Sequence, residues 1–410
     1  MNLRESFMIN KTSAKNYIFV LCLSILIIRP QIIISYFPSS VFVFTILQAA
    51  IILSFFVFTR VLYINKFLLL VLIYYLYDFL NTSMQHSGSI NNVIVPGIWA
   101  VSTIYIVMYC IRKIGIAESF RMLSYSFSSV LWINYILMVL YPNGLANGSH
   151  IENRYTSIHL LGQSNQMTIY IFASILLMIC SIITGKKITI RYLLFTLLPV
   201  LLPYTISGVS FSATGKLGMV IIAIGLVLFW IAPKFINRIS KPPIIVLISV
   251  IFFITLTRLL TLEAVSNFIV NVLGKDVTLS ERTTIWSQTY VMLSDFKTLV
   301  FGIGEVGGGG YVQIWTGHIF SAHNILLQVC LLGGLCLIII FLIMFGIAVK
   351  NIGQIADKNR ALVSIMLLAF CFENMMEVYP FAMIVFSLFI FSLSGEYFIN
   401  DGQIDRKESY

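Results

Sequence analysis

A histidine and an asparagine, His323 and Asn324, stand directly before a run of apolar residues in the stretch Phe320–Gly334. A neutral histidine can take a proton from a hydroxyl group near pH 7, so His323 is a candidate general base. A histidine that only caps a helix or packs at the membrane surface is the simpler alternative. Asn324, beside it, is a candidate for binding a polar substrate.

Arg282 follows Ser280, a residue type that caps helix starts, and is therefore expected in the first turn of a helix. A cation there opposes the helix dipole unless an anion lies nearby. Glu281 could be that anion. A phosphate group is the alternative, because the arginine fork fits phosphate oxygens. Arg282 is therefore a candidate for anion binding.

Lys216 follows a turn of small and hydroxylated residues, 205–215, and opens the next apolar segment. Exposed N–H groups and a cation at a helix start suit a phosphate, although a lysine that snorkels beside a Gly/Ser turn is the alternative. Arg258 lies near the outer end of a predicted membrane helix. Ionisable groups at membrane depth are functional candidates, and snorkelling or ion pairing is again the alternative.

Two further polar residues precede or begin the sixth predicted helix. Asn165 lies in the segment 161–168, where a polar loop turns into that helix. It could cap the helix or bind sugar hydroxyl groups. Arg154, in the loop before it, is also a candidate for substrate binding.

Several enzyme classes have no motif here. The chain contains no GxSxG, HExxH or P-loop pattern and no paired-carboxylate motif. Its six cysteines lie in apolar runs without metal-ligand spacing, so they are expected to be packing residues. We therefore expect neither a metal nor another cofactor.

The elements that must position these residues are membrane helices. Of the 410 residues, 59% are hydrophobic and 10% are charged. A soluble domain carries about 25% charged residues, so this composition predicts an integral membrane protein. A spanning helix needs about 20 apolar residues. Twelve candidate spans follow, at 16–36, 41–59, 66–80, 93–111, 122–141, 166–184, 192–206, 217–232, 243–260, 322–348, 361–378 and 380–396.

The distribution of charge predicts the topology. Nineteen of the 26 Lys and Arg residues fall in alternate loops or at the termini. The positive-inside rule makes these segments, and both termini, cytoplasmic. The net charge of +10 is thus a topology signal, and we expect no nucleic-acid partner. The first apolar run lacks an A-x-A cleavage site and is expected to be a retained signal anchor.

The predicted fold is an all-α polytopic membrane protein in three parts. Residues 1–260 form nine membrane helices with short loops. Residues 261–321 form one large external loop, whose segment 279–296 is predicted to be an amphipathic helix on the membrane surface with Ile285, Trp286, Tyr290 and Leu293 on one face. Residues 322–410 form three membrane helices and a short cytoplasmic tail.

These motifs resemble a known family. The pattern Arg282…Trp286…Gly302-x-Gly304…His323-Asn324-x-x-Leu327…Gly333-Gly334 looks like the C-terminal signature of the O-antigen ligase and polymerase superfamily. The segment around Asn165 and the large external loop before the His323 helix also resemble that family.

The resemblance implies a GT-C type glycosyltransferase fold and a donor glycan carried on undecaprenyl diphosphate, with neither metal nor nucleotide. Arg282 then binds the diphosphate, and His323 activates the acceptor or orients the donor. Lys216 matches the position of a second family arginine. It keeps the charge without the bidentate fork, unless that role has shifted to Arg258 or Arg29.

The preferred function is a polymerase that joins lipid-linked repeat units of a surface polysaccharide: O-antigen, capsule or exopolysaccharide. Its partners would be the lipid-linked donor and acceptor, membrane lipid, a flippase and a chain-length regulator. One alternative is an O-antigen ligase that transfers glycan to lipid A–core; another is a lipid-linked oligosaccharide flippase. The expected location is the cytoplasmic membrane of a bacterium, with the site on the extracytoplasmic face.

Overall fold

The computed structural model describes residues 11–59, 64–85, 88–151, 154–185, 189–206, 212–259, 282–306, 312–315 and 318–397. These residues are mostly helical and include two short antiparallel hairpins. The chain divides into two compact units. The first comprises residues 1–63 and 101–211, and the second comprises residues 64–100 and 212–410.

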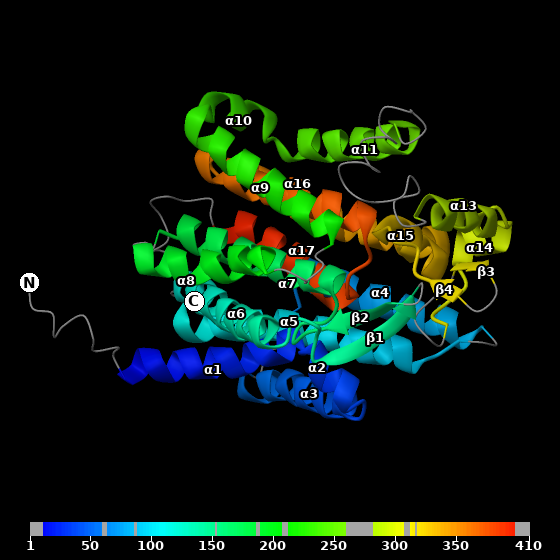
Figure 1. Ribbon diagram of the computed structural model, residues 1–410, viewed down its shortest axis with the longest axis horizontal. Helices are drawn as coiled ribbons and strands as arrows, with labels where there is room; N and C mark the ends of the chain where they lie inside the picture. The colour runs from blue at the N-terminus through cyan, green and yellow to red at the C-terminus, as the bar shows by residue number, and fades with distance from the viewer. Residues whose placement is uncertain are drawn as a thin grey trace, which may run out of the picture. The chain divides into compact units, whose positions relative to one another are not determined.

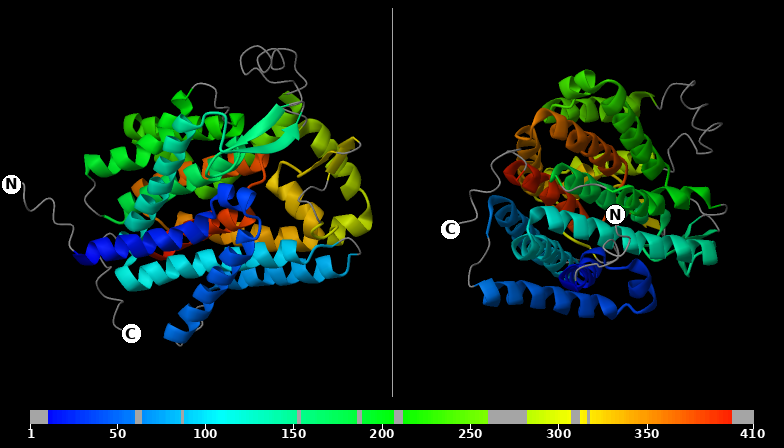
Figure 2. Two further views of the ribbon diagram at one scale, coloured as in Figure 1. Left: turned by 60° about the horizontal axis from the view of Figure 1, so that its bottom comes forward. Right: turned by 90° about the vertical axis from the view of Figure 1, so that its left-hand side faces the viewer.

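The first unit is a helical bundle built around one central helix, α6. That helix packs against α1, α7 and α8, and Figures 1 and 2 show α1 beside it. The elements are α1 (Lys11–Ile28), α2 (Gln31–Tyr36), α3 (Ser40–Thr59), α6 (Ile116–Leu140), β1 (Ala146–Ile151), β2 (Arg154–Ile158), α7 (Ser164–Ile183), α8 (Ile190–Leu201) and the 3-10 helix η1 (Leu202–Thr205). Helix α5 (Asn91–Ile114) contributes residues to both units.

The first apolar run is broken in two. The range 16–36 was expected to form one span, but α1 ends at Ile28 and α2 begins at Gln31. Pro30 has no N–H group to continue the helix, and Arg29 adopts a left-handed φ of 47°. The buried Arg29 guanidinium donates hydrogen bonds to Thr45 and Gln48, and both of these partners belong to the first unit.

The second unit is organised around α15, a long apolar helix that packs against α4, α13, α14, α16 and α17. Helix α9 lies beside α16 (Figure 1). The elements are α4 (Lys66–Ser83), α9 (Ala213–Ile231), α10 (Pro233–Ile239), α11 (Pro242–Leu259), α13 (Arg282–Leu293), α14 (Phe296–Phe301), β3 (Val312–Trp315), β4 (His318–Phe320), α15 (Ile325–Gly353), α16 (Asp357–Met376) and α17 (Phe381–Tyr397).

A kink in α15 holds the segment that follows α14. Gly333 and Gly334 leave helical geometry, which frees the carbonyl groups of the preceding turn. The N–H groups of Ile303 and Gly304 donate to Leu331 O and Leu332 O at 2.7 and 2.9 Å. The Asn81 amide of α4 also donates to Leu332 O, at 2.9 Å. This hydrogen-bonded contact, which we call the glycine clasp, fixes the segment 301–304 to α15.

The expected membrane spans are present as helices, but fewer of them meet a strict length and composition test. A helix lies in each of the twelve predicted ranges. Within the described residues, seven helices are long and apolar enough to cross a membrane, or eight if the bent pair α10–α11 is one span. Three shorter apolar helices lie at Ala14–Ile28, Ile190–Thr205 and Phe381–Leu393. The protein is therefore a mostly helical polytopic membrane protein, and the count of twelve and the GT-C type architecture stay predictions.

The predicted external loop 261–321 holds α13, α14, β3 and β4 in its described part. Helix α13 buries Ile285 and Trp286 against residues of α15 and α16. Tyr290 was expected on the same face, yet it is exposed. Positions 285 and 290 lie about 140° apart on a helix with 3.6 residues per turn, so the two faces differ. The three-part domain scheme and the membrane-surface location of this helix stay predictions.

Candidate functional site

Four helix ends of the second unit bring polar side chains together. Thr214 is the second residue of α9, Arg282 begins α13, His323 lies two residues before α15, and Glu377 directly follows α16. Helices α9, α15 and α16 are all candidate membrane spans. The cluster therefore lies where three apolar helices end.

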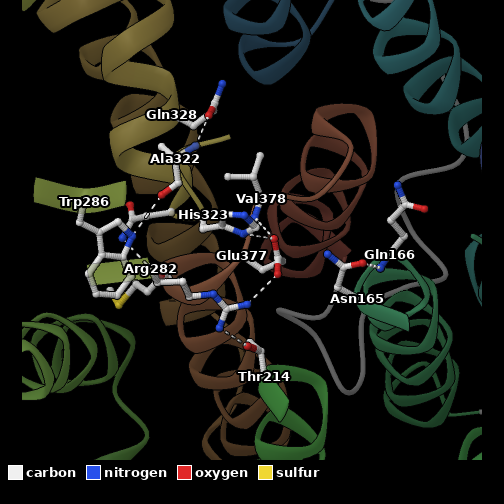
Figure 3. Close-up of polar contacts among 12 residues, drawn as sticks. Asn165, Gln166, Thr214, Arg282, Trp286, Ala322, His323, Gln328, Glu377 and Val378 are labelled. Atoms are coloured by element: carbon white, nitrogen blue, oxygen red, sulfur yellow. Dashed lines mark hydrogen bonds and ion pairs between the residues drawn. The ribbon is translucent and has the colours of Figure 1, made fainter. Parts of the chain in front are cut away.

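Arg282 is held by two partners. Its Nη2 atom lies 2.8 Å from Oε2 of Glu377, and its Nη1 atom donates to Thr214 Oγ1 at 3.2 Å (Figure 3). The Arg282 side chain is 15% exposed and the Glu377 side chain 4% exposed. The cation at the start of α13 thus has a buried carboxylate as its counter-ion, and this anion is Glu377. The expected candidate, Glu281, lies outside the described residues.

His323 contacts the other oxygen of the same carboxylate. Its Nδ1 atom lies 2.7 Å from Glu377 Oε1, and Figure 3 shows the imidazole and the guanidinium on the two oxygens. The His323 side chain keeps 22% exposure, so the ring is reachable from outside the protein. The geometry joins a permanent cation and a potential base through one buried acid.

The backbone at His323 is unusual and is held from both sides. Its φ of 45° is left-handed, which costs a non-glycine residue about 1–2 kcal/mol. Before it, the Ala322 N–H donates to Gln328 Oε1 at 2.8 Å, and the Ala322 carbonyl accepts from Trp286 Nε1 at 3.1 Å. After it, the Asn324 side chain caps α15. Strain of this kind persists only where the surroundings over-determine it, and it is common at functional sites.

Asn324 does the structural work expected of a cap. Its Oδ1 atom accepts from the N–H groups of Leu326 and Leu327 at 2.9 and 3.1 Å. Its amide donates to Met375 O at 3.0 Å, which connects α15 to the end of α16. Asn324 is 1% exposed. It therefore positions His323 and Glu377, while the predicted binding of substrate by Asn324 stays untested.

Glu377 owes its place to the end of α16. The helix predicted at 361–378 stops at Met376, so Glu377 lies beyond the span in extended geometry, three residues before Pro380. Burial by itself raises the pKa of this carboxyl. The hydrogen bond from His323 and the positive charge of Arg282 outweigh burial and bring its pKa below the ordinary value of 4.5. The carboxylate is therefore ionised at neutral pH.

Two of the predicted diphosphate-binding cations have no described contact with this cluster. Lys216 lies in the first turn of α9, two residues after Thr214, and its side chain is exposed. Arg258 lies in α11, but its side chain is outside the described residues. A diphosphate role for either residue stays a prediction.

The two predicted substrate-binding residues of the first unit are positioned locally. Asn165 is the second residue of α7, and its Oδ1 atom accepts from the Gln166 N–H at 3.0 Å, so it satisfies an N–H group of the first turn. The N-cap position itself is Gln163, whose N–H donates to Gln166 Oε1 at 3.0 Å. Arg154 begins β2, and its side chain is outside the described residues. Sugar binding by either residue stays a prediction.

Reasoning from the sequence missed Glu377 and Thr214. Glu377 falls at the end of the predicted span 361–378, and no role was expected for it. An acidic residue at the end of an apolar run is, however, a functional candidate by the same rule that singled out Arg258. Thr214 fell inside the small-residue segment before Lys216 but carried no signal of its own. In the described part of the chain, no group of three or more His, Cys, Asp or Glu side chains is arranged to hold a metal ion.

Residues 208–342 match the family model Wzy_C, described as O-antigen ligase. The predicted resemblance to the O-antigen ligase and polymerase superfamily is confirmed. The match spans about a third of the chain and includes Thr214, Arg282 and His323, whereas Glu377 lies beyond it. A comparison with curated proteins finds no match.

The match supports an enzymatic activity of the O-antigen ligase and polymerase type in general. It also supports membrane location and lipid-linked glycan substrates in general. The match does not distinguish polymerase activity from ligase activity.

Proposed function

We propose that this protein is a polymerase that joins undecaprenyl-diphosphate-linked oligosaccharide repeat units into a surface polysaccharide. The observation that carries the proposal is the convergence of Arg282 and His323 on one buried carboxylate, at the ends of three candidate membrane helices. A lipid-linked sugar presents its diphosphate at this height, because its tail stays in the bilayer. The site therefore has an anion-binding group and a potential base where the reacting ends would meet.

Arg282 would stabilise the leaving group. Breaking the bond between the anomeric carbon and the diphosphate develops negative charge on the phosphate oxygens. A fixed cation at a site with little water stabilises that charge strongly. Arginine has five N–H donors, and in the described residues Arg282 uses one on Glu377 and one on Thr214. The other donors remain for phosphate oxygens.

His323 would activate the acceptor. A sugar hydroxyl group is a poor nucleophile at neutral pH, and a positioned base contributes typically 10²–10⁴-fold to the rate. The imidazole takes the hydroxyl proton as the oxygen attacks the anomeric carbon, and the lipid diphosphate leaves with the bonding electron pair. This step uses no metal and no nucleotide.

An apolar cavity supports a lipid-linked donor. It has a volume of about 320 Å³ and is lined by side chains of α9, α11 and α16, among them Leu217, Phe252 and Phe372. Phe372 also packs with Trp286, which is one turn along α13 from Arg282. Apolar space next to a cationic site suits a substrate with a hydrocarbon tail and an anionic head.

The location follows from the same proposal. The site would face the extracytoplasmic side of a bacterial cytoplasmic membrane, with both termini in the cytoplasm, as the positive-inside rule predicts. A flippase would deliver the donor to that side, and a chain-length regulator would act on the growing polymer.

A second candidate is an O-antigen ligase, because the matched family model carries that description. Both activities transfer a glycan from the same lipid diphosphate, and they differ in the acceptor. The residues of the site serve either reaction, so the acceptor has to be identified by experiment.

The test is deletion of the gene in its host, followed by gel analysis of surface glycan. A polymerase deletion leaves single repeat units on their carrier and no long chains. A ligase deletion leaves long chains on undecaprenyl diphosphate. Loss of all surface glycan, with single units retained on the cytoplasmic side, would mean a flippase and would refute the proposal.

Complementation then tests the site. We expect Arg282→Ala and His323→Ala proteins to reach the membrane at normal levels and to restore no long chains. Lys297→Ala, which removes an exposed cation of α14 that forms no described ion pair with Glu377, is the matched control and should restore them. Normal chains from both the Arg282 and His323 variants would reject the site assignment.

A further inference from the structure

One carboxylate contacts both groups that the proposed reaction uses. Glu377 places Oε1 at 2.7 Å from His323 Nδ1 and Oε2 at 2.8 Å from Arg282 Nη2 (Figure 3). It is 3% exposed and follows a helix that the family match does not include. Its two oxygens therefore have different partners. The bond to Arg282 at one oxygen limits the hydrogen-bond roles that are open to His323 at the other.

The hydrogen-bond roles in this cluster are determined by chemistry. Arginine only donates, so Oε2 accepts from Arg282. An ionised carboxylate only accepts, so the Nδ1 atom of His323 must carry the hydrogen at Oε1. A neutral imidazole has one N–H group, which leaves a lone pair on Nε2. In the part of the chain that the structure describes, Nε2 has no hydrogen-bond partner.

We propose that Glu377 is a positioning residue that holds His323 in the Nδ1–H form, with Nε2 as the atom that receives the proton of the acceptor hydroxyl. This inference rests on the proposed function, in which His323 is the base. The hydroxyl proton moves to Nε2, the oxygen forms a bond to the anomeric carbon, and the carbon–diphosphate bond breaks with its electrons on the leaving group. The resulting imidazolium has its positive charge beside the Glu377 carboxylate, which stabilises it.

The same carboxylate also sets the position of Arg282. A guanidinium held by Glu377 and Thr214 has a fixed orientation, so its remaining N–H groups point in a constant direction. Glu377 thereby fixes the distance between the proton acceptor and the cation for the leaving group. A reaction that attacks one side of a carbon and expels a group from the other requires such fixed spacing.

The informative variant is Glu377→Gln, which preserves size and removes the charge. A glutamine side chain has one acceptor oxygen and one donor nitrogen. Arg282 requires the oxygen, so the NH₂ group faces Nδ1 of His323, and the imidazole hydrogen moves to Nε2. The base is then blocked while the arginine contact is kept.

The matched control is Glu373→Gln. Glu373 lies one turn earlier on α16 and is 2% exposed, so it is a second buried acid on the same helix. Among the described residues its Oε2 atom has no hydrogen-bond partner, and it forms no ion pair with Arg282 or His323. A general effect of losing a buried acid from this helix would appear in both variants.

The first measurement is nitrogen NMR of the purified full-length protein with ¹⁵N-labelled histidine. The His323 signals are those that vanish in His323→Ala. We expect the Nδ1–H pattern in the wild type and in Glu373→Gln, and the Nε2–H pattern in Glu377→Gln. An Nε2–H pattern in the wild type overturns the proposal even if the Glu377 variant fails to fold.

The second measurement is glycan transfer by the same proteins with a lipid-diphosphate-linked oligosaccharide. For Glu377→Gln we expect kcat to fall by about 10²–10⁴-fold, with a much smaller change in KM for the donor. Wild-type kcat in Glu377→Gln, or an equal loss in Glu373→Gln, overturns the proposal.

The two proposals can fail separately. If His323→Ala and Arg282→Ala keep full activity, the proposed function of the site fails, whatever the tautomer. If they lose activity while Glu377→Gln keeps it, the proposed function stands and the positioning role of Glu377 is rejected.

Discussion

At position 323 the proposed activity requires a histidine, whereas the left-handed backbone is less strained with glycine. The φ of 45° destabilises a residue with a Cβ atom by about 1–2 kcal/mol, whereas glycine adopts this φ without strain. Alanine and glycine both lack the imidazole, so both lose the hydrogen bond to Glu377. The comparison of His323→Ala with His323→Gly therefore isolates the backbone.

The expected difference is small but measurable. Relief of strain favours the glycine variant by about 1–2 kcal/mol, and the larger freedom of glycine in the unfolded chain removes about 0.4–1 kcal/mol of that gain. The net advantage of His323→Gly over His323→Ala is thus about 1 kcal/mol. In a chain of this size it corresponds to a melting temperature higher by about 1–2 °C.

The assay is thermal unfolding of both proteins in one detergent, followed by tryptophan fluorescence, together with transfer activity. His323→Asn should lie near the glycine variant, because asparagine tolerates the left-handed region better than alanine. We expect all three variants to be inactive. A glycine variant less stable than the alanine variant would refute the reasoning, since it would mean that the native backbone at 323 carries no strain.

The remaining predictions concern the surroundings of the cluster. Gln328→Leu leaves the buried N–H of Ala322 without an acceptor, so it should lower the free energy of unfolding by about 1–3 kcal/mol and reduce transfer activity, as denaturation and activity assays will show. Gly334→Ala places a Cβ on the carbonyl of Val300 at a φ of 61°, and we expect poor membrane accumulation on an immunoblot. Lys216→Arg should keep transfer activity and Lys216→Ala should reduce it; full activity of the alanine variant removes Lys216 from the site. Because the pKa of Glu377 is lowered, its ion pairs contribute stability that is present above about pH 4.5 and is lost as pH falls through the lowered value. The melting-temperature gap between wild type and Glu377→Gln, measured at a series of pH values, should therefore shrink as pH falls below 4.5.

Much of the helical structure was predictable from the length of the apolar runs. A helix lies in each of the twelve expected ranges because backbone groups in a membrane must be satisfied within the segment. The break after Ile28 was not expected, because a hydropathy average over a whole span hides the effect of a single residue. Pro30, which cannot continue a helix, was the available signal. The exposure of Tyr290 was also missed, since an isolated helix pattern does not reveal which of two apolar faces a neighbouring helix covers.

The site was predictable in part. Arg282 and His323 were found from residue type, from the expected ends of helices and from the family signature. Their common partner was not found, because Glu377 is 95 positions from Arg282 and 54 positions from His323. Such a pairing depends on how α13, α15 and α16 pack, and a single sequence contains no record of that packing.

The structure separates the family signature into two kinds of residue. Arg282 and His323 reach the buried carboxylate, whereas Gly302 and Gly334, with φ values of 75° and 61°, lie beside the glycine clasp, where a Cβ at Gly302 would meet the backbone of Leu332 and one at Gly334 the backbone of Val300. The clasp fixes the N-terminal half of α15, and the residue just before that half is the cap Asn324. The spacing of the signature is therefore constrained both by the contacts with Glu377 and by the glycine clasp. Glu377 lies outside the matched region, so α16 must supply the acid that the signature alone does not contain.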